Sequence, residues 1–551
     1  MKCKELTRRF APAAVACGAG VAAILPAAAR GFPYGNDLPH HYRMSLAFYD
    51  SIRAGNLYPG LIASTNGGFG DFSPRLYPPL VYYLLAAGRG VAGDWYAGSF
   101  LVFSLLSAAG CLGIYFWARA FLAPRHAALA GALYAFVPFR LDDFYQGSYF
   151  GQYAAGAVLP FAFAFVERVC RRGTRRDVAG LAASFALLCL THLPLTVIGS
   201  LSLLVYALLR LPHGARLTAA LRLAGGVLLG LLCSSFYWAT MLAERSWVRI
   251  GFEQPGRWAD YSRNFLFQRE VYPETVWVLF VNVVAVATFA MFLPALALAR
   301  RWREVGPKSE VKALAALLLL STFFATPLSR PVWAVLPSLQ QTQFPWRWLA
   351  VASMAGPPLV AASVPVWAEQ LKGYGRALSL AVACVMLALV ASASSFVVTQ
   401  ADYYSRAEFD AKLVTLPDSA TLSDWLPAWA KTVPPKADAP LRIPQRTFTI
   451  RTWEPERRAF RVAAGQAVEA RVRAFYYPRW VAVDERGGIL PTRPDEDGAL
   501  LVSLPAEEVS VELNFREPRL AKLSGAASAA GWVLLFALCV SGRRREPPSA
   551  V

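Results

Sequence analysis

The sequence predicts an all-α polytopic membrane protein of about twelve transmembrane helices, with a small β-sandwich-like external domain near its C-terminus. Of the 551 residues, 56% are hydrophobic and only 17% are charged, whereas a soluble domain is typically about 25% charged. Apolar runs long enough to cross a bilayer recur along most of the chain. One later stretch alternates apolar and polar residues as β-strands do. Together these observations indicate an integral membrane protein with one water-exposed domain.

The apolar runs predict the helices in chain order. The first covers residues 10–29, roughly the 20 residues that a span needs. The others lie near residues 95–118, 127–139, 153–167, 178–191, 194–210, 223–243, 275–299, 313–328, 347–367, 376–398 and 524–541. The first run also resembles a signal peptide, because a basic start and an apolar core precede Ala27-Ala28-Ala29. We favour an uncleaved anchor, because many spans follow it.

The net charge of +19 reflects topology and does not indicate a nucleic-acid partner. Basic residues cluster beside spans, as the positive-inside rule expects of cytoplasmic segments. The clusters lie at residues 2–9, 171–176, 300–303 and 543–545. Every cluster is cytoplasmic, with both termini inside, if the short apolar stretch at residues 76–91 does not cross. We therefore expect that stretch to lie on or dip into the outer face of a bacterial inner (cytoplasmic) membrane, with the functional face outside.

External segments are expected to hold the functional residues. They are residues 30–94, 140–152, 244–274, 328–346 and 400–523. In the first, Asp37 can cap a helix whose residues Met44, Phe48 and Ile52 recur at helical spacing and would rest on the membrane surface. The last is large enough to be a domain, and the final span tethers it. The predicted parts are a membrane module (1–399), a β-rich domain (400–523) and a final helix with a basic tail (524–551).

Asp37 is the candidate general base. An acid directly after the first span can reach both a water-soluble acceptor and a lipid headgroup, which an enzyme acting on lipid-linked substrates requires. The alternative role of Asp37 is that of a helix cap alone. His40, His41 and Arg43 follow it and are candidates for substrate binding, the alternative being ordinary polar residues at the interface.

Acidic residues at other span ends are weaker candidates. Asp142 and Asp143 could bind substrate or a divalent cation such as Mg or Mn that neutralises a leaving phosphate. Adjacent acids in a strand-like loop point apart, however, so one of them is expected to be solvated. Glu244 could be a second acid, and its alternative is an ion pair with Arg245.

Arg347 lies where the headgroup of a lipid would sit. Its planar guanidinium suits phosphate oxygens, and the alternative is an interfacial anchor between Trp346 and Trp348. His192, at an outer span end, could reach a substrate cavity, but it is expected to be a structural histidine. The many Tyr and Trp residues near span ends are expected to form a membrane-interface belt.

Short motifs resemble the 6-pyruvoyl-tetrahydropterin-synthase-related membrane proteins. They are the acid, His and Arg after the first span, Tyr77-Pro78-Pro79, Val137-Pro138-Phe139-Arg140 and Gln343-Phe344-Pro345-Trp346-Arg347. This family in turn looks like the GT-C class of membrane glycosyltransferases. That resemblance implies a sugar donor on a polyprenyl phosphate or pyrophosphate and an essential carboxylate in the first external loop. Segments 424–429 and 475–515 are similar to the C-terminal β domain of YfhO-like membrane proteins.

The sequence therefore predicts a glycosyltransferase acting at the outer face. Asp37 would deprotonate an acceptor hydroxyl and Arg347 would stabilise the departing lipid phosphate. The expected partners are a lipid-linked sugar donor, a glycan, lipid or protein acceptor, and the bilayer. The rival hypotheses are a transporter or flippase of lipid-linked sugars and a non-catalytic scaffold for envelope polysaccharide assembly. Charges gather at span ends and span interiors are almost free of them, which favours surface chemistry over ion-coupled transport.

Overall fold

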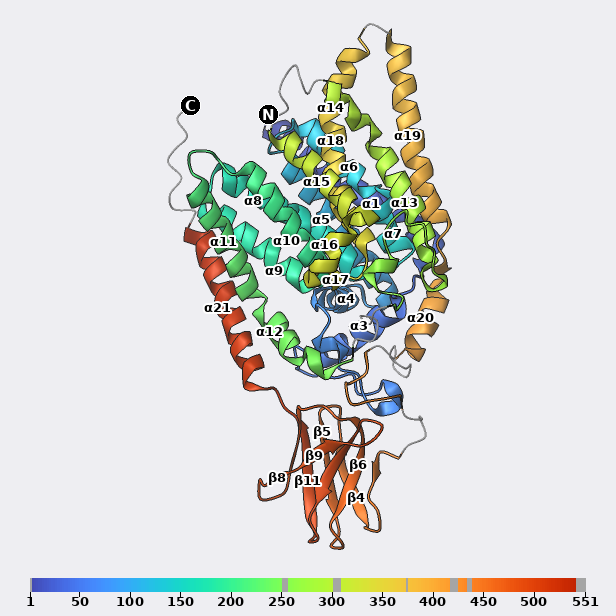
Figure 1. Ribbon diagram of the computed structural model, residues 1–551, viewed down its shortest axis with the longest axis vertical. Coiled ribbons are helices and arrows are strands. Elements are labelled where there is room, and N and C mark those ends of the chain that lie inside the picture. Colours follow the sequence, from blue (N-terminus) through green and yellow to red (C-terminus); the bar gives the residue numbers. More distant parts are fainter. Residues whose placement is uncertain are drawn as a thin grey trace.

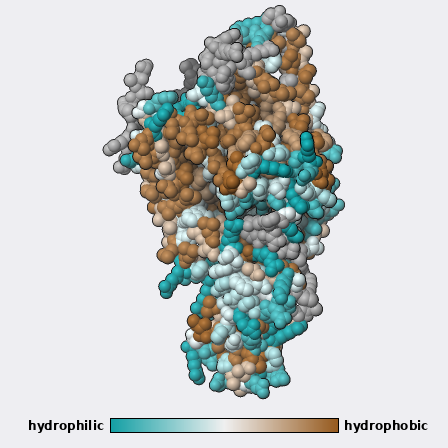
Figure 2. Space-filling view, in the orientation of Figure 1, coloured by the Kyte–Doolittle hydropathy of each residue, from teal (hydrophilic) through white to brown (hydrophobic). Residues whose placement is uncertain are grey.

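A bundle of long helices with a β domain at one end makes up the protein (Figure 1). The computed structural model describes residues 2–249, 256–300, 309–372, 375–416, 425–433 and 439–541. The last helix runs from the β domain back along the bundle, so its end and the start of the first helix both lie away from the β domain (Figure 1). On the face in Figure 2, hydrophobic residues cover much of the bundle and hydrophilic residues much of the β domain. That division fits a bundle in lipid and a domain in water.

Apolar helices form most of the bundle. They are α1 (Lys2–Ala22), α5 (Trp95–Ala118), α6 (Pro124–Ala135), α8 (Phe150–Arg171), α9 (Arg175–Thr191), α10 (Leu193–Arg210), α11 (Arg216–Cys233), α13 (Trp277–Phe292), α15 (Ser309–Ala325), α18 (Leu349–Gln370), α19 (Gly375–Thr399) and α21 (Arg519–Ser541). Other helices connect them or lie beside them. They are α2 (Leu25–Arg30), α3 (Leu38–Arg53), α4 (Leu80–Ala92), α7 (Pro138–Tyr145), α12 (Ser235–Glu244), α14 (Ala297–Arg300), α16 (Arg330–Val335), α17 (Pro337–Gln340) and α20 (Arg406–Thr415).

In the described part of the chain, nine helices are long and apolar enough to cross a membrane, or ten if a pair bent by 82° after α15 counts as one span. The expectation of about twelve spans is therefore too high by this measure. Two of the apolar runs form shorter helices, since α6 has 12 residues and α9 has 17. Both still pack inside the bundle. Helix α6 lies against α1 and α5, whereas α9 lies against α8 and α11. The stretch at residues 76–91 yields α4, whose 13 residues are too few to span a bilayer, as predicted.

The helix after Asp37 forms as expected but faces protein. In α3, Met44 and Phe48 are fully buried against Ile62 and Tyr82 of the same external segment. The loop that follows α3 folds back over its apolar face and removes that face from water and lipid alike. The prediction that this face rests on the membrane surface is therefore wrong.

Two antiparallel sheets form the β domain, as predicted. Their strand orders are β3-β6-β10-β9 and β4-β5-β11-β7-β8. The strands are β3 (Leu441–Arg442), β4 (Phe448–Trp453), β5 (Arg457–Val462), β6 (Val468–Phe475), β7 (Trp480–Val483), β8 (Ile489–Leu490), β9 (Thr492–Pro494), β10 (Ala499–Leu504) and β11 (Val509–Phe515). Alternate residues of β11, such as Val511 and Leu513, are buried. They join apolar residues of the other sheet in one core, as sheet packing requires.

Residues 401–416, which follow α19, pack with the bundle. β2 (Tyr403–Tyr404) pairs with β1 (Phe32–Pro33), which follows the first span. In α20, Phe409 is buried in the same core as Phe32 and Tyr42, with ring centroids 5.2 and 5.0 Å away. The sheets themselves begin at Leu441, later than the boundary at residue 400 drawn from the sequence.

Contacts from external segments attach the β domain to the bundle. The ring of Phe72 stacks on Tyr477, with centroids 4.0 Å apart and an interplanar angle of 10°. Glu244, at the end of α12, accepts hydrogen bonds from the Tyr477 hydroxyl at 3.0 Å and from Arg479. The side chains of Glu244 and Arg479 are each only 2% exposed. This buried ion pair and the stacked rings bridge the two parts and so help to hold the β domain in place.

Candidate active site

A cavity of about 460 Å³ lies where the bundle meets its external segments. Its wall is largely apolar and aromatic with a few converging polar groups, the usual character of a small-molecule site. The carboxyl, imidazole and guanidinium side chains on the wall are those of Asp37, His40, His192, Arg245 and Arg347. They come from the start of α3, the junction of α9 and α10, the end of α12 and the start of α18. Of the residues predicted from the sequence, Asp37, His40 and Arg347 are thus brought together.

Asp37 faces this cavity from the residue before α3. It occupies the N-cap position, but its side chain makes no capping hydrogen bond. Burial raises the pKa of its carboxyl to about 6, and the positive charge of Arg347 opposes that rise. The alternative of a helix cap alone therefore lacks its defining hydrogen bond. A carboxylate with a pKa near neutrality is suited to take a proton from a substrate hydroxyl.

Arg347 is held in a defined orientation on the cavity wall. Its Nε donates to Gln152 Oε1 at 3.2 Å. Its Nη1 donates to the carbonyl oxygen of Thr342 at 2.6 Å and to Gln343 Oε1 at 3.2 Å. The guanidinium carbon lies 4.5 Å from the centroid of the Phe344 ring. Among the described residues Nη2 has no hydrogen-bond partner, so it can bind an anion such as a phosphate oxygen.

The tryptophans beside Arg347 are buried in protein. Trp346 is 1% exposed and Trp348 is 0% exposed, and Trp348 stacks on Phe324 with centroids 4.5 Å apart. The alternative of an interfacial anchor does not describe this group, because snorkelling requires an exposed position. Several aromatic residues expected in a membrane belt also line the cavity. They include Tyr77, Tyr149, Trp258, Trp277 and Trp425.

Asp142 and Asp143 lie on a helix instead of in a strand-like loop. Both are buried in α7, each 3% exposed, so the expectation that one of them is solvated is wrong. The helix packs against α13 and α19, which removes both acids from water. Asp143 accepts a hydrogen bond from Gln152 Nε2 at 2.5 Å, and that amide accepts in turn from Arg347. No group of three or more His, Cys, Asp or Glu side chains in the described residues could hold a metal ion, and a cation at these two acids stays a prediction.

The two adjacent histidines, His40 and His41, lie in different surroundings. The ring of His40 lines the cavity, with its centroid 4.7 Å from that of Tyr77. Burial lowers the pKa of its imidazole well below the usual value, so His40 is neutral. His41 instead lies against Tyr82, whose hydroxyl is 3.1 Å from Nδ1, and stacks on Phe150 at 5.0 Å. His41 is therefore part of the packed interior.

Arg43 and Glu244 do not line this cavity. Arg43 is 5% exposed, and the charge of Asp71 acts on it. Glu244 binds Arg479 of the β domain, a partner that its neighbourhood in the sequence does not suggest. Arg245, which follows Glu244, is the residue that lines the cavity. Arg43 and Glu244, which were predicted to bind substrate, thus interact with other residues of the protein.

Gln152 is a contributor that sequence reasoning missed, and His192 is one for which it favoured a structural role. Gln152 is 1% exposed near the start of a long apolar helix, and this isolated polar residue was the only available signal. His192 accepts a hydrogen bond at Nδ1 from the backbone N–H of Leu195 at 3.2 Å, which caps α10. It lines the cavity as well. His192 therefore has the structural role that was predicted and is also placed to contact a ligand.

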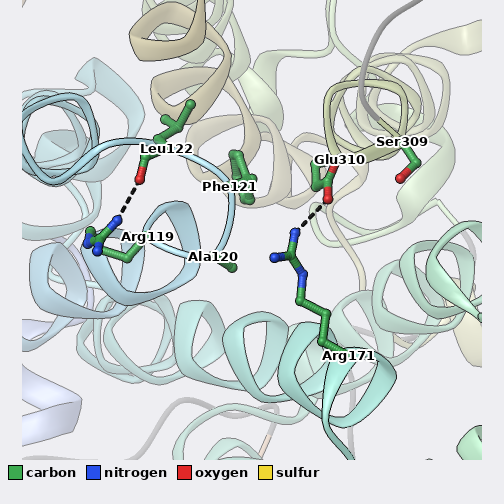
Figure 3. A pocket seen from close by; sticks show the side chains of 7 residues that line it. All are labelled: Arg119, Ala120, Phe121, Leu122, Arg171, Ser309 and Glu310. Atoms are coloured by element: carbon green, nitrogen blue, oxygen red, sulfur yellow. Dashed lines mark hydrogen bonds and ion pairs between the residues drawn. The ribbon is translucent and has the colours of Figure 1, made fainter. Parts of the chain in front are cut away.

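A second cavity, of about 540 Å³, lies between the end of α8, the start of α15 and the loop after α5. Figure 3 shows Arg171 directed at Glu310, to which its Nη2 donates at 2.6 Å. Glu310 also pairs with Arg210 at 2.9 Å, and Arg210 pairs with the buried Glu167 at 2.8 Å. These charges neutralise one another and join α8, α10 and α15. None of the candidate catalytic or substrate-binding residues predicted from the sequence lines this cavity.

A family model matches residues 75–402 of this chain, namely the 6-pyruvoyl-tetrahydropterin synthase related domain of membrane proteins. The match covers more than half of the 551 residues. The chain belongs to this family. Within the 6-pyruvoyl-tetrahydropterin synthase related domain lie Asp142, Asp143, Glu244 and Arg347, whereas Asp37 precedes it. The predicted family, and the prediction of a membrane protein with several spans, are confirmed.

Solved structures of limited similarity extend the comparison. The arabinofuranosyltransferase AftD from Mycobacteria is 18% identical, with a TM-score of 0.44 over 74% of this chain and 27% of that one. The apo oligosaccharyltransferase of Archaeoglobus fulgidus is 14% identical, with a TM-score of 0.44 over 73% of this chain and 57% of that one. The oligosaccharyltransferase AglB from the same organism, in complex with an inhibitory peptide and a dolichol-phosphate, is 14% identical, with a TM-score of 0.45 over 74% and 58%. This chain spans less than two thirds of each of those proteins. The comparison with curated proteins found no match.

Proposed function

We propose that this membrane protein is a glycosyltransferase that moves a sugar from a polyprenyl-phosphate-type donor to an acceptor hydroxyl at the outer face. The observation that carries the proposal is the presence of Asp37 and Arg347 in one largely aromatic cavity. Sugar transfer from a lipid phosphate needs a base for the acceptor and a cation for the leaving group. These two residues supply that pair of opposite charges.

The reaction divides between the two residues. The acceptor oxygen attacks the anomeric carbon while Asp37 takes its proton. The bond from the anomeric carbon to the phosphate oxygen breaks, and the polyprenyl phosphate leaves with the bonding electrons. Arg347, oriented by Gln152 and by the carbonyl oxygen of Thr342, stabilises the negative charge that develops on the phosphate. The predicted Mg or Mn would be held by Asp142 and Asp143, which are buried in α7 and do not line this cavity.

The test follows release of the polyprenyl carrier by the purified protein in lipid nanodiscs supplied with polyprenyl-phosphate-linked sugars. Asp37→Asn should reduce the rate by about 10²–10⁴-fold, the usual contribution of a general base. It should leave the protein folded, because the Asp37 side chain makes no capping hydrogen bond. Asp50→Asn is the matched control, an exposed acid on the same helix, and should keep full activity.

Each outcome of the assay separates the hypotheses. Full activity of Asp37→Asn would exclude it as the base. No carrier release by the unmutated protein with any donor sugar would refute the transferase and favour the transporter or the scaffold. Activity that survives EDTA would exclude an essential divalent cation at Asp142 and Asp143.

A further inference from the structure

Aromatic side chains around Arg347 form one continuous group. Trp258 stacks near Phe344 with centroids 5.9 Å apart, and Phe344 stacks on Trp346 at 5.1 Å. Tyr149 continues the group at 5.8 Å from Trp346. Because Arg347 lies over Phe344, this group borders the proposed phosphate position and is called the donor group.

A second aromatic group lines the same cavity and is called the platform. It consists of His40, Tyr77 and Trp425. The centroid of Tyr77 lies 4.7 Å from that of His40 and 5.3 Å from that of Trp425. His40 and Trp425 are nearly parallel, at 24° and 6.4 Å. Two rings from the external segment 30–94 and one ring from the chain before the β-sheets thus form a compact surface.

The proposed base and cation line the same cavity as the donor group and the platform. Tyr149 of the donor group and Tyr77 of the platform each experience the charges of both Asp37 and Arg347. Besides its phosphate-binding side, the proposed base therefore has a second side formed by the platform residues, which carry no guanidinium, although Arg245 also lines the cavity. A transferase needs such a second side for its acceptor.

Packing holds Trp425 in place. Its side chain packs against the core of the bundle and against the core of the β domain. The next residue, Leu426, accepts a hydrogen bond from the backbone N–H of Arg249 at 2.7 Å, and Pro427 forms a β-bridge with Val248. The ring is thus pre-positioned, which lowers the cost of binding a ligand.

The chemistry of the platform suits a neutral, hydroxyl-rich ligand. Aromatic faces are electron-rich, and the C–H groups on one face of a sugar ring can pack on them. His40 is neutral, and its Nε2 has no hydrogen-bond partner among the described residues. Its imidazole can therefore bind a sugar hydroxyl. A phospholipid headgroup would instead require a cation, which these three residues do not offer.

We propose that His40, Tyr77 and Trp425 form an acceptor subsite that binds a sugar residue, so that the acceptor is a glycan. That the bound sugar belongs to the acceptor rests on the proposed transferase function. Sugar binding itself can be measured without any transfer activity.

Binding is tested with protein in nanodiscs free of glucoside and maltoside detergents, which would compete for the subsite. The probes are methyl glycosides and disaccharides of glucose, galactose, mannose, rhamnose and arabinofuranose, followed by saturation-transfer NMR. At least one probe should bind, and Trp425→Ala should weaken its binding about tenfold or more, as loss of a buried aromatic anchor does. Trp425→Phe should retain most of the affinity.

The matched control is Trp429→Ala. Trp429 belongs to the same segment but packs on Tyr476 of the β domain, with centroids 4.9 Å apart, and it does not line the cavity. This variant should bind the probes as the unmutated protein does. Absence of binding by the whole panel, or equal losses in the Trp425→Ala and Trp429→Ala variants, would overturn the subsite.

The transfer assay gives an independent result. Trp425→Ala should raise the KM for a glycan acceptor and leave the KM for the donor unchanged. Transfer to a lipid or peptide that Trp425→Ala leaves unaffected would overturn the subsite but keep the transferase. Sugar binding that depends on Trp425 without any transfer would support the subsite and refute the transferase.

Discussion

Gln152 on α8 holds Arg347 at the start of α18 by accepting a hydrogen bond from its Nε over 3.2 Å. The orientation of the Gln152 amide is itself set, because its Nε2 donates to Asp143 at 2.5 Å. The orientation of the Arg347 guanidinium thus depends on a series of hydrogen-bonded side chains from α7 through α8 to the start of α18. A guanidinium held in this way need not reorganise when a phosphate binds or leaves.

Gln152→Ala should therefore impair donor binding. Loss of a hydrogen bond to a charged group costs about 1.5–3 kcal/mol, so the KM for the donor should rise about tenfold or more, with the acceptor KM unchanged. Steady-state kinetics with each substrate varied in turn checks this split. Gln146→Ala is the control, since Gln146 ends α7 and donates to the carbonyl oxygen of Val397. Equal kinetics in both variants would exclude a positioning role.

The activity should depend on pH through Asp37. Its pKa of about 6 means that the carboxyl is protonated, and inactive as a base, below that pH. The value of kcat/KM should therefore fall about tenfold per pH unit below 6 and level off above about 7. Arg347→Ala removes the charge that lowers this pKa, so the acidic limb should move to higher pH. A flat profile from pH 5 to 8 would contradict Asp37 as the base.

Arg479→Ala should destabilise the junction of the β domain and the bundle. It leaves the buried carboxylate of Glu244 without its cation, and breaking a buried pair costs about 3–5 kcal/mol. Thermal unfolding and limited proteolysis in nanodiscs would measure the loss. Arg493→Ala is the control, because Arg493 pairs with Glu469 on the exposed surface. Equal destabilisation by the two variants would contradict the proposed attachment.

The predicted topology can be read from reporter fusions. If α4 does not cross and the predicted run at residues 127–139, which contains most of α6, does cross, reporters near residues 122 and 173 should both report cytoplasm. A fusion near residue 450, in the β domain, should report the outside. Finding residue 173 outside would reverse the membrane orientation and place the cavity on the opposite face.

The sequence by itself determined the class of the fold and several members of the cavity. Span length and strand alternation depend on backbone geometry over a few residues, so the long apolar helices and strands such as β5, β6 and β11 could be predicted. The positions of Asp37 directly after the first span and of Arg347 at the start of α18 could likewise be predicted from the apolar runs beside them in the sequence. The family could be recognised from short motifs for the same reason.

Only the tertiary structure decided which side chains meet. Glu244 binds Arg479, a residue 235 positions away, and not a partner set by its neighbour in the sequence. His40 reaches the cavity and His41 does not, although the two differ by one position on α3. Met44 and Phe48 are covered by protein instead of lipid, because a loop folds back over them. A local pattern shows that a face must be buried or a charge must be paired, but the partner is chosen by contacts between segments far apart in the chain.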